Sequence, residues 1–265
     1  MNTLLRTIIE GLVTILWPPR STCLTCGGPL PEVPPPLATI AETVPVCDAC
    51  WAAMPFDPDS RLCRNCSRPI SGSPGICVEC LEPPPFGRVW ALGLHRGVLR
   101  TAIHHVKFRG RQALGEALGG YLAARVHEPP EVIIPIPLHP SRLRERGYNQ
   151  AARIAAGLSE RLGAPVVEGD LIRLRRTGEQ TRRDRTERWR NLAGAFGVCR
   201  GRVPAWAGRD VLLVDDVLTT GATAAAAAEV LRATGARTVS LAVVAVSDKP
   251  VPAAGAPLLA GEATD

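Results

Sequence analysis

Lysine is almost absent from this 265-residue chain. Only Lys107 and Lys249 are lysines, so 29 of the 31 basic residues are arginines. Neither lysine completes a GxxxxGK[ST] pattern, and no GxGxxG is present, which excludes a P-loop and a dinucleotide fingerprint. Arginine suits two-pronged contacts to phosphate or carboxylate. A GC-rich genome would produce the same excess of arginine, so the composition leaves both explanations open.

A membrane-spanning segment is also not expected in the amino-terminal region, although residues 1–19 are apolar enough to be considered. Their apolar positions repeat at helical spacing, and Arg6 and Glu10 fall on another face. This segment is too short and too charged to cross a bilayer. The alternative, a helix lying on a membrane surface, would need a cluster of cations on its polar face. Since no small-residue cleavage site follows, we expect an amphipathic helix in a cytoplasmic protein.

The overall composition is that of a globular protein. Hydrophobic residues make up 46% of the chain, and the net charge is +6 with a pI of about 9.0. The length allows one large or two smaller domains. Function therefore has to be sought in local patterns.

Cysteine provides the first specific pattern, because eight of the nine cysteines form four CxxC units. Two such units can complete a tetrahedral thiolate site, so the chain predicts two structural zinc ions. Four disulfides or a redox CxxC would fit less well, because we expect no signal peptide at the amino terminus and a redox site needs only one CxxC unit. Sequential pairing of the units is simpler than cross-bracing. The expected ligands are Cys23, Cys26, Cys47, Cys50, Cys63, Cys66, Cys77 and Cys80.

Residues 20–82 are thus expected to form a double zinc ribbon, since the Pro-rich stretches between the units would not fold without metal. The remaining cysteine, Cys199, is expected to be a buried small apolar residue and not a nucleophile.

From residue 88 to 247 the pattern changes to strands alternating with helices. This alternation predicts an α/β domain with a mostly parallel sheet flanked by helices. Residues 248–265 are expected to form a disordered tail. Strands are expected at 89–95, 131–137, within 164–175, at 209–217 and at 238–247, and helices at 98–110, 112–126, 147–163 and 220–236.

The stretch VLLVDDVLTTGAT at 211–223 carries the clearest chemistry. A buried strand delivers Asp215 and Asp216 to its carboxyl end, where ligands bind in such sheets. The turn that follows opens a helix, so its backbone N–H groups and the helix dipole favour a phosphate. The two carboxylates could accept hydrogen bonds from ribose hydroxyls and share a hydrated magnesium ion. A plain strand, polar turn and Thr-capped helix would explain the threonines but not the adjacent acids.

This stretch resembles the phosphoribosyl pyrophosphate (PRPP) motif of type I phosphoribosyltransferases. The CxxC array, HHVKFRGR, PIPLHPSRLRERGYNQA and RTGEQTRRDRTERWRNLAGAF extend the resemblance to the ComF family over roughly residues 20–247. ComF proteins are competence-associated and phosphoribosyltransferase-like, with an amino-terminal zinc ribbon. The resemblance implies a type I phosphoribosyltransferase fold.

It also implies roles for individual residues. Asp215 and Asp216 would contact the ribose, and the turn Thr219, Thr220, Gly221, Ala222 and Thr223 would hold the 5′-phosphate. His139, Arg142 and Arg146 lie in a segment similar to the family's pyrophosphate loop, and Arg146 joins the two acids as a candidate catalytic residue. Residues 173–190 carry eight arginines against three acids and resemble the mobile loop of the fold, with Gln180, Arg185 and Arg188 as candidate ligand contacts. In that loop Arg183 replaces an apolar residue of the family.

The implied reaction is magnesium-dependent phosphoribosyl transfer with release of pyrophosphate, connected to DNA uptake. An alternative is a non-catalytic PRPP- or nucleotide-binding factor that contacts single-stranded nucleic acid through its zinc ribbon and arginine-rich loop. A zinc-ribbon protein with a vestigial site is the weakest interpretation, because the acids and the turn are intact. The sequence names neither the acceptor nor the oligomeric state.

Overall fold

The computed structural model describes residues 23, 26, 28, 47–53, 61–73, 75–82, 84–175, 194–199 and 204–254. The expected helix over residues 1–19 lies outside the described residues. So do residues 176–190 of the arginine-rich segment, the following residues 191–193 and residues 255–265 of the tail.

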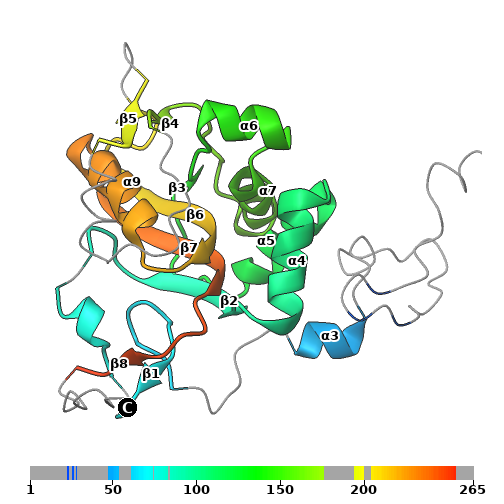
Figure 1. Cartoon of the computed structure of the whole chain (residues 1–265). Helices are drawn as coiled ribbons and strands as arrows, with labels where there is room; N and C mark the ends of the chain where they lie inside the picture. Colours follow the sequence, from blue (N-terminus) through cyan, green and yellow to red (C-terminus); the bar gives the residue numbers. More distant parts are fainter. Residues whose placement is uncertain are drawn as a thin grey trace, which may run out of the picture.

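A parallel sheet forms the centre of the molecule (Figure 1). Its four strands are β2 (Val89–Leu94), β3 (Val132–Pro135), β6 (Asp210–Leu218) and β7 (Thr238–Val246), in the order β2-β7-β6-β3. All neighbouring strands run parallel. These strands are almost continuously apolar because helices cover both faces of the sheet. The predicted α/β fold with a mostly parallel sheet is confirmed.

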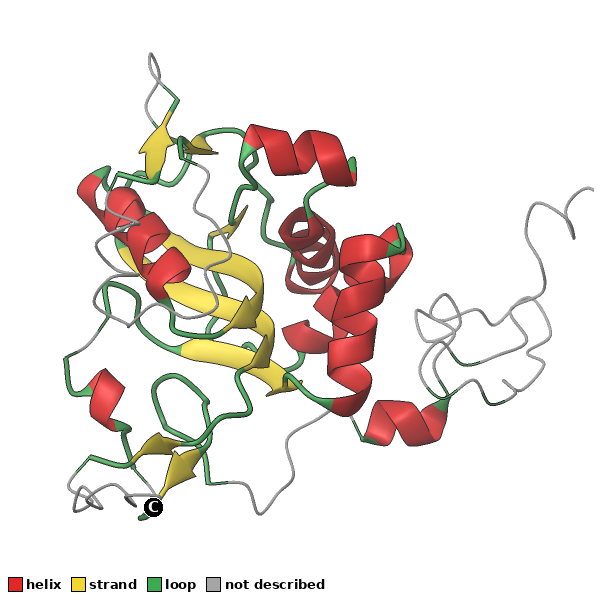
Figure 2. Ribbon diagram, in the orientation of Figure 1, coloured by secondary structure: helices red, strands yellow, loops and turns green. Residues whose placement is uncertain are grey.

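Helices α4 (Gly97–Phe108), α5 (Gln112–Ala123) and α7 (Gln150–Leu162) cover one face, and α9 (Ala222–Ala233) covers the other (Figure 2). Side chains alternate along each strand, so Leu212 and Val214 pack with α4, α5 and α7 while Val211 and Leu213 pack with α9. The central sheet thereby separates two hydrophobic cores.

Close packing of α5 on α7 depends on two glycines. A Cβ atom on Gly119 would lie 2.0 Å from the Ile154 carbonyl oxygen, and one on Gly157 would lie 1.8 Å from that of Glu116. Any side chain at either position would push the helices apart. This contact holds α7, and with it the residues that precede α7, close to the end of the sheet.

Two small strand pairs flank the central sheet. The antiparallel pair of β4 (Leu171–Arg173) and β5 (Phe196–Val198) brackets the arginine-rich segment. The parallel pair of β1 (Ile70–Ser71) and β8 (Val251–Pro252) joins the cysteine-rich region to the end of the chain. The cysteine-rich region also contains two short helices, α3 (Asp48–Ala52) and the 3-10 helix η1 (Val78–Cys80).

Three expectations need correction. Within the segment expected as a disordered tail, Val251 and Pro252 form strand β8, which pairs with β1. The segment expected as a loop after β3 contains a helix, α6 (Pro140–Arg146), with His139 as its N-cap, a proline in its first turn and Gly147 in the left-handed conformation at its end. Cys199 is exposed and not buried.

Across the part of the chain that the structure describes, no helix combines the length and apolar character that crossing a membrane would need.

Candidate functional site

The turn between β6 and α9 forms a small cavity at the carboxyl end of the sheet. Gly221 adopts a left-handed conformation (φ 77°) and is the N-cap of α9. It has no side chain to cap the helix, so the first-turn N–H groups stay available to a ligand. The cavity has a volume of about 40 Å³, and its lining includes Asp215, Thr219, Thr220, Gly221, Ala222 and Thr223.

The two acids of β6 serve different sides of the sheet. Asp215 lines the cavity of the turn. Asp216 is 5% exposed and lies on the other side, where its Oδ2 is 2.8 Å from Lys107 Nζ of α4. Adjacent residues of a strand point to opposite faces, which explains this division. A ligand that uses both carboxylates must therefore lie across the end of β6.

The pKa of Asp215 is raised well above that of an ordinary aspartate. Burial, together with the neighbouring Asp216 carboxylate, raises the pKa of Asp215 to about 7. Lys107 and Arg173 act in the opposite direction, because their positive charges favour the ionised form. A cation or a hydrogen-bond donor placed beside Asp215 would ionise it at neutral pH.

Replacing Asp215 with asparagine is expected to stabilise the ligand-free protein above pH 7. An unfolded aspartate has a pKa near 3.9, so between about pH 4 and 7 the folded state binds more protons and stability falls as the pH rises. Asparagine does not ionise, so the variant avoids this loss of stability at high pH. The melting temperature of Asp215→Asn should exceed that of the wild type at pH 8, by about 2–4 °C for each kcal/mol of unfolding free energy gained. The difference should shrink at pH 5.

The matched control is Asp210→Asn, at the other end of β6. Arg237 and Thr238 hold the pKa of Asp210 at about 2, so losing this exposed carboxylate should slightly lower the melting temperature at both pH values. An Asp215→Asn protein that is less stable than the wild type at pH 8 would contradict the argument.

Two basic residues beside the acids are absent from the sequence-based site. Lys107 contacts Asp216, and Arg173 of β4 interacts electrostatically with Asp215. The rarity of lysine is a signal that could have drawn attention to Lys107. Arg173 had no distinguishing signal, because it is one of eight arginines in its segment.

A second, larger cavity of about 640 Å³ lies between α4, α6 and the start of α7. Lys107 lines it, which connects it to Asp216. The Arg146 guanidinium lies 5.2 Å from the centre of the Phe108 ring and donates a hydrogen bond to the Gln150 side chain. The lining is strongly basic and includes His95, Arg100, His104, Lys107, Arg142 and Arg146.

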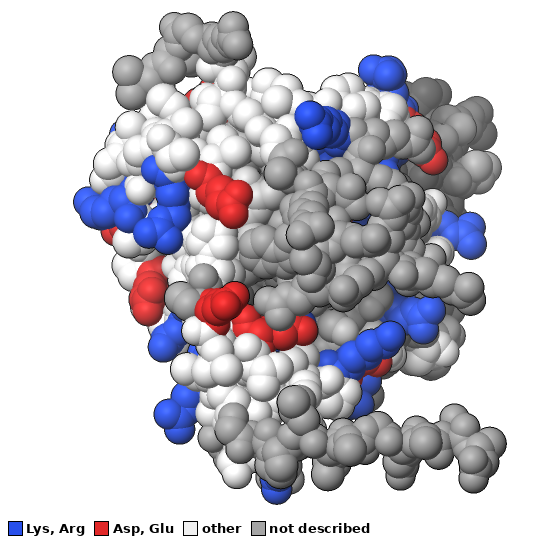
Figure 3. Space-filling model, turned by 60° about the vertical axis from the view of Figure 1, so that its left-hand side comes forward, with Lys and Arg blue, Asp and Glu red and all other residues white. Residues whose placement is uncertain are grey.

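The structure thus brings most of the expected site residues to one end of the sheet. Asp215 and the turn line the small cavity, while Arg142 and Arg146 line the large one. His139 lines neither cavity, and its Nδ1 accepts the Ser141 N–H as the cap of α6. Gln180, Arg185 and Arg188 lie outside the described residues. On the face of the molecule in Figure 3, basic and acidic side chains of the described residues are interspersed, which adds no support for a nucleic-acid contact there.

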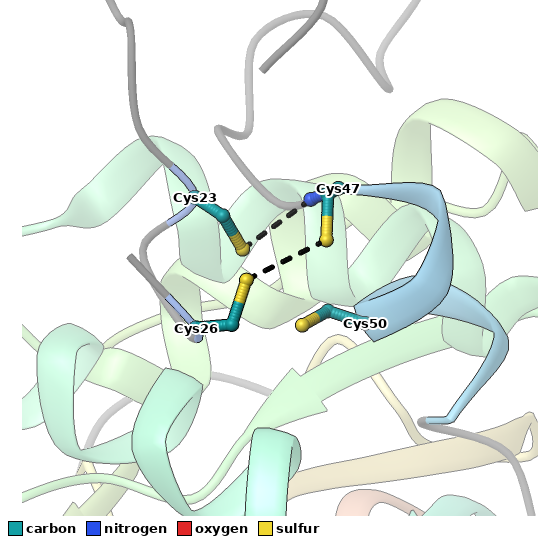
Figure 4. Close-up of side chains that lie close together, drawn as sticks. All are labelled: Cys23, Cys26, Cys47 and Cys50. Carbon is teal, nitrogen blue, oxygen red and sulfur yellow. Dashed lines mark hydrogen bonds between the residues drawn. The ribbon is translucent and has the colours of Figure 1, made fainter. Parts of the chain in front are cut away.

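The eight CxxC cysteines form two clusters, each built from consecutive units. Cys23, Cys26, Cys47 and Cys50 make the first cluster, with their sulfurs facing one another (Figure 4), and Cys63, Cys66, Cys77 and Cys80 make the second. This pairing matches the sequential arrangement expected from the sequence. The first cluster adjoins the hydrophobic core on the α4 side of the sheet, and the second belongs to the core on the α9 side.

Both clusters fit a zinc ion. Within each cluster the sulfurs lie within 4.8 Å of one another, and the Cys26–Cys47 and Cys66–Cys77 sulfur distances are both 3.7 Å. Zn–S bonds of about 2.3 Å in a tetrahedron give sulfur separations of about 3.8 Å. Burial first, and neighbouring sulfurs second, raise the pKa of Cys50 to about 12 and that of Cys77 to about 11. Metal binding must therefore displace protons from these thiols.

Known proteins share both parts of this architecture. The double zinc ribbon domain model matches residues 12–81, and the phosphoribosyl transferase domain model matches residues 149–254. The DNA utilization protein YhgH of Escherichia coli O157:H7 is 33% identical over 205 residues, which cover 74% of this chain and 88% of that protein. This chain belongs to the ComF family.

Other ComF relatives have names connected with competence. Competence protein F of Haemophilus influenzae is 30% identical over 201 residues, covering 72% of this chain and 85% of that protein. Competence protein ComFC of Bacillus subtilis is 26% identical over 202 residues, covering 66% and 80%. Among solved structures, a glutamine PRPP amidotransferase from B. subtilis, complexed with ADP and GMP, matches 49% of this ComF chain and 25% of its own, with 24% identity and a TM-score of 0.34.

Proposed function

We propose that this ComF-family protein binds PRPP across the end of β6 and transfers its phosphoribosyl group, releasing pyrophosphate in a magnesium-dependent reaction. The observation that carries the proposal is the division of the acid pair. Asp215 lines the cavity of the turn, while Asp216 lies beside Lys107, which lines the basic cavity. A ligand with a phosphate at each end and a sugar between them suits this arrangement.

The turn of 219–223 would hold the 5′-phosphate. Its N–H groups open helix α9, whose amino-terminal end attracts negative charge. The cavity has a volume of about 40 Å³ and is lined by the small and hydroxyl-bearing residues of the turn, which suits a phosphate. Gly221 is needed at this point because its φ of 77° favours glycine.

The acids would hold the ribose hydroxyls. Asp215 could accept a hydrogen bond from one hydroxyl on the α9 side, and Asp216 from the other on the α4 side. Asp216 Oδ2 has Lys107 as its neighbouring charge and no well-directed hydrogen bond within the described residues. Carboxylate oxygens of this kind are hard ligands, so the acid pair also fits magnesium. Bound magnesium would neutralise charge on the departing pyrophosphate.

The basic cavity would receive the pyrophosphate. Arg142 and Arg146 of α6 and Lys107 of α4 place fixed positive charge where the leaving group accumulates negative charge. The α6 helix is held by its His139 cap and by Gly147, so these arginines start from a fixed backbone. Preorganised charge of this kind lowers the barrier without reorganisation during the reaction.

The reaction would be a displacement at the anomeric carbon of the ribose. A nitrogen nucleophile forms a bond to this carbon while the carbon–oxygen bond to pyrophosphate breaks, and the electron pair leaves with the pyrophosphate. The proton lost by the nitrogen passes to water or to the leaving group. The chain's own residues supply orientation and charge: the turn fixes one end of the substrate, and the arginines stabilise the other.

The names of the relatives support a connection with DNA. One group is called DNA utilization protein, and others are called competence proteins. We therefore propose that the phosphoribosyl chemistry, or the binding of PRPP without turnover, serves the uptake or use of DNA. An assay of turnover distinguishes phosphoribosyl transfer from binding alone.

Pyrophosphate release measures turnover directly. The protein, PRPP and Mg²⁺ would be incubated with nucleobases, ammonia and simple amines, each with and without EDTA. We expect release that depends on one acceptor class and on the metal, and that falls about 100-fold or more in Arg146→Met with Arg142→Met, because two charge-assisted contacts are lost. The control is Arg144→Met, on α6 outside the cavity lining. If the protein binds PRPP but releases no pyrophosphate with any acceptor, it is the non-catalytic binding factor and not a transferase.

A further inference from the structure

Arg68 of the second cysteine-rich ribbon reaches the turn that lines the small cavity. Its Nη1 donates a hydrogen bond of 3.2 Å to the carbonyl oxygen of Thr219, 151 residues further along the chain. The same guanidinium donates through Nε to Cys66 Sγ at 3.5 Å and through Nη2 to the Glu79 carboxylate. One side chain thus joins a cysteine of the second cluster to the start of the turn.

The Arg68 side chain is buried, so its charge depends on these hydrogen-bond partners. Arg68 is 7% exposed, and buried charge is tolerated only when it is paired and hydrogen-bonded. Cys66 and Cys80 line a cavity of about 20 Å³ together with Leu218, Thr220 and Gly221. The second cluster therefore lies directly against the turn. No residue of the first cluster lines this cavity or the cavity of the turn.

The ribbon that carries Arg68 is held to strand β2 of the central sheet before that residue and to strand β8 after it. The Ser67 hydroxyl donates to the Val89 carbonyl at 2.9 Å, and the Val89 N–H donates to the Asn65 carbonyl at 3.0 Å. The Val251 N–H donates to the Pro69 carbonyl at 2.9 Å. Arg68 thus starts from a backbone that is rigid relative to β2 and β8.

We propose that Arg68 is a positioning residue that couples the second cysteine cluster to the 5′-phosphate turn. The Cys66 sulfur and the Glu79 carboxylate aim the guanidinium, and the guanidinium fixes the Thr219 carbonyl, so that the N–H groups of the turn point into the cavity. The Cys66 sulfur belongs to the second cluster and also accepts the Arg68 hydrogen bond, so zinc bound there would fix the position of the sulfur that orients Arg68. Zinc in the second cluster then favours phosphate binding, and by linkage phosphate binding raises the zinc affinity of that cluster by the same factor.

The phosphate part of this inference rests on the proposed function, whereas the effect on the turn does not. The test therefore has two measurements on the full-length zinc-loaded protein. Hydrogen exchange of the amides of 219–223, without ligand, reports the turn alone. Calorimetry with ribose 5-phosphate and, separately, with pyrophosphate reports binding at the two cavities.

The test variant is Arg68→Met, and the control is Arg61→Met, which removes an arginine of the same ribbon whose guanidinium donates to the Gly72 carbonyl. We expect Arg68→Met to speed exchange in the turn about 10-fold and to weaken ribose 5-phosphate binding about 10-fold, the effect of one charged hydrogen bond. Pyrophosphate binding should not change, and Arg61→Met should behave as the wild type. Glu79→Gln keeps Arg68 but removes the charge of the carboxylate that orients it. This variant should give a smaller effect in the same direction.

The outcomes separate the two proposals. Unchanged exchange in both Arg68→Met and Glu79→Gln would overturn the positioning role. Equal weakening of ribose 5-phosphate and pyrophosphate binding would also overturn it, because that pattern indicates general destabilisation. If the wild type binds neither ligand, the proposed function fails, and the exchange measurement still decides the role of Arg68.

Discussion

Asp215→Asn combined with Asp216→Asn is expected to abolish magnesium-dependent PRPP binding. The double variant removes both carboxylates at the end of β6, one beside the small cavity and one beside Lys107. Each charge-assisted hydrogen bond contributes about 1.5–3 kcal/mol, so the affinity should fall by more than about 100-fold. Loss of the magnesium contact would add to this effect.

Isothermal titration calorimetry with PRPP, in the presence and absence of Mg²⁺, measures this result. Asp210→Asn is the control, because it makes the same change in the same strand but at the opposite end from the cavities. The wild type should bind more weakly as the pH falls below about 7, since Asp215 then gains a proton that binding has to remove. A double variant with unchanged affinity would refute the assignment of the acids.

Removing metal is expected to have the largest effect on stability. Each four-cysteine cluster should hold one zinc ion, and binding of a structural zinc contributes on the order of 10 kcal/mol to folding. Cys63→Ser with Cys66→Ser should lose one equivalent of zinc and unfold the ribbon around β1. Because that ribbon pairs with β8 and contacts the turn, the melting temperature of the whole protein should fall with it.

Elemental analysis of the purified protein and thermal unfolding with and without a chelator test this prediction. The matched variant is Cys23→Ser with Cys26→Ser, which should lose the other equivalent but leave ribose 5-phosphate affinity unchanged. Well under two equivalents of zinc in the wild type would refute the two-site assignment. Equal loss of ligand affinity in both double variants would argue against a special connection between the second cluster and the turn.

Local patterns predicted a large part of the fold. The strand ending in Asp215 and Asp216, the turn at 219–223 and the alanine-rich helix were all readable from hydrophobic periodicity and turn residues. The CxxC spacing predicted two four-cysteine clusters because neighbouring thiols on a tight turn can face one ion. Helix α6 was missed, since its cap is a histidine and its sequence lacks apolar periodicity.

Strand β8 was also missed, because its partner β1 is far away in the sequence. Composition describes a segment by itself and carries no information about a distant strand. The exposure of Cys199, beyond the end of β5, is likewise set by tertiary placement.

The sequence by itself determined which chemistry is available to this protein: eight paired thiolates, two adjacent acids and a phosphate-sized turn, all within segments short enough for local rules to apply. Only the tertiary structure decided which groups meet. The placement of Lys107 beside Asp216, of Arg173 near Asp215 and of Arg68 against Thr219 depends on how strands and helices pack. These contacts join residues far apart in the chain, and packing of the two cores, not local preference, brings such residues together.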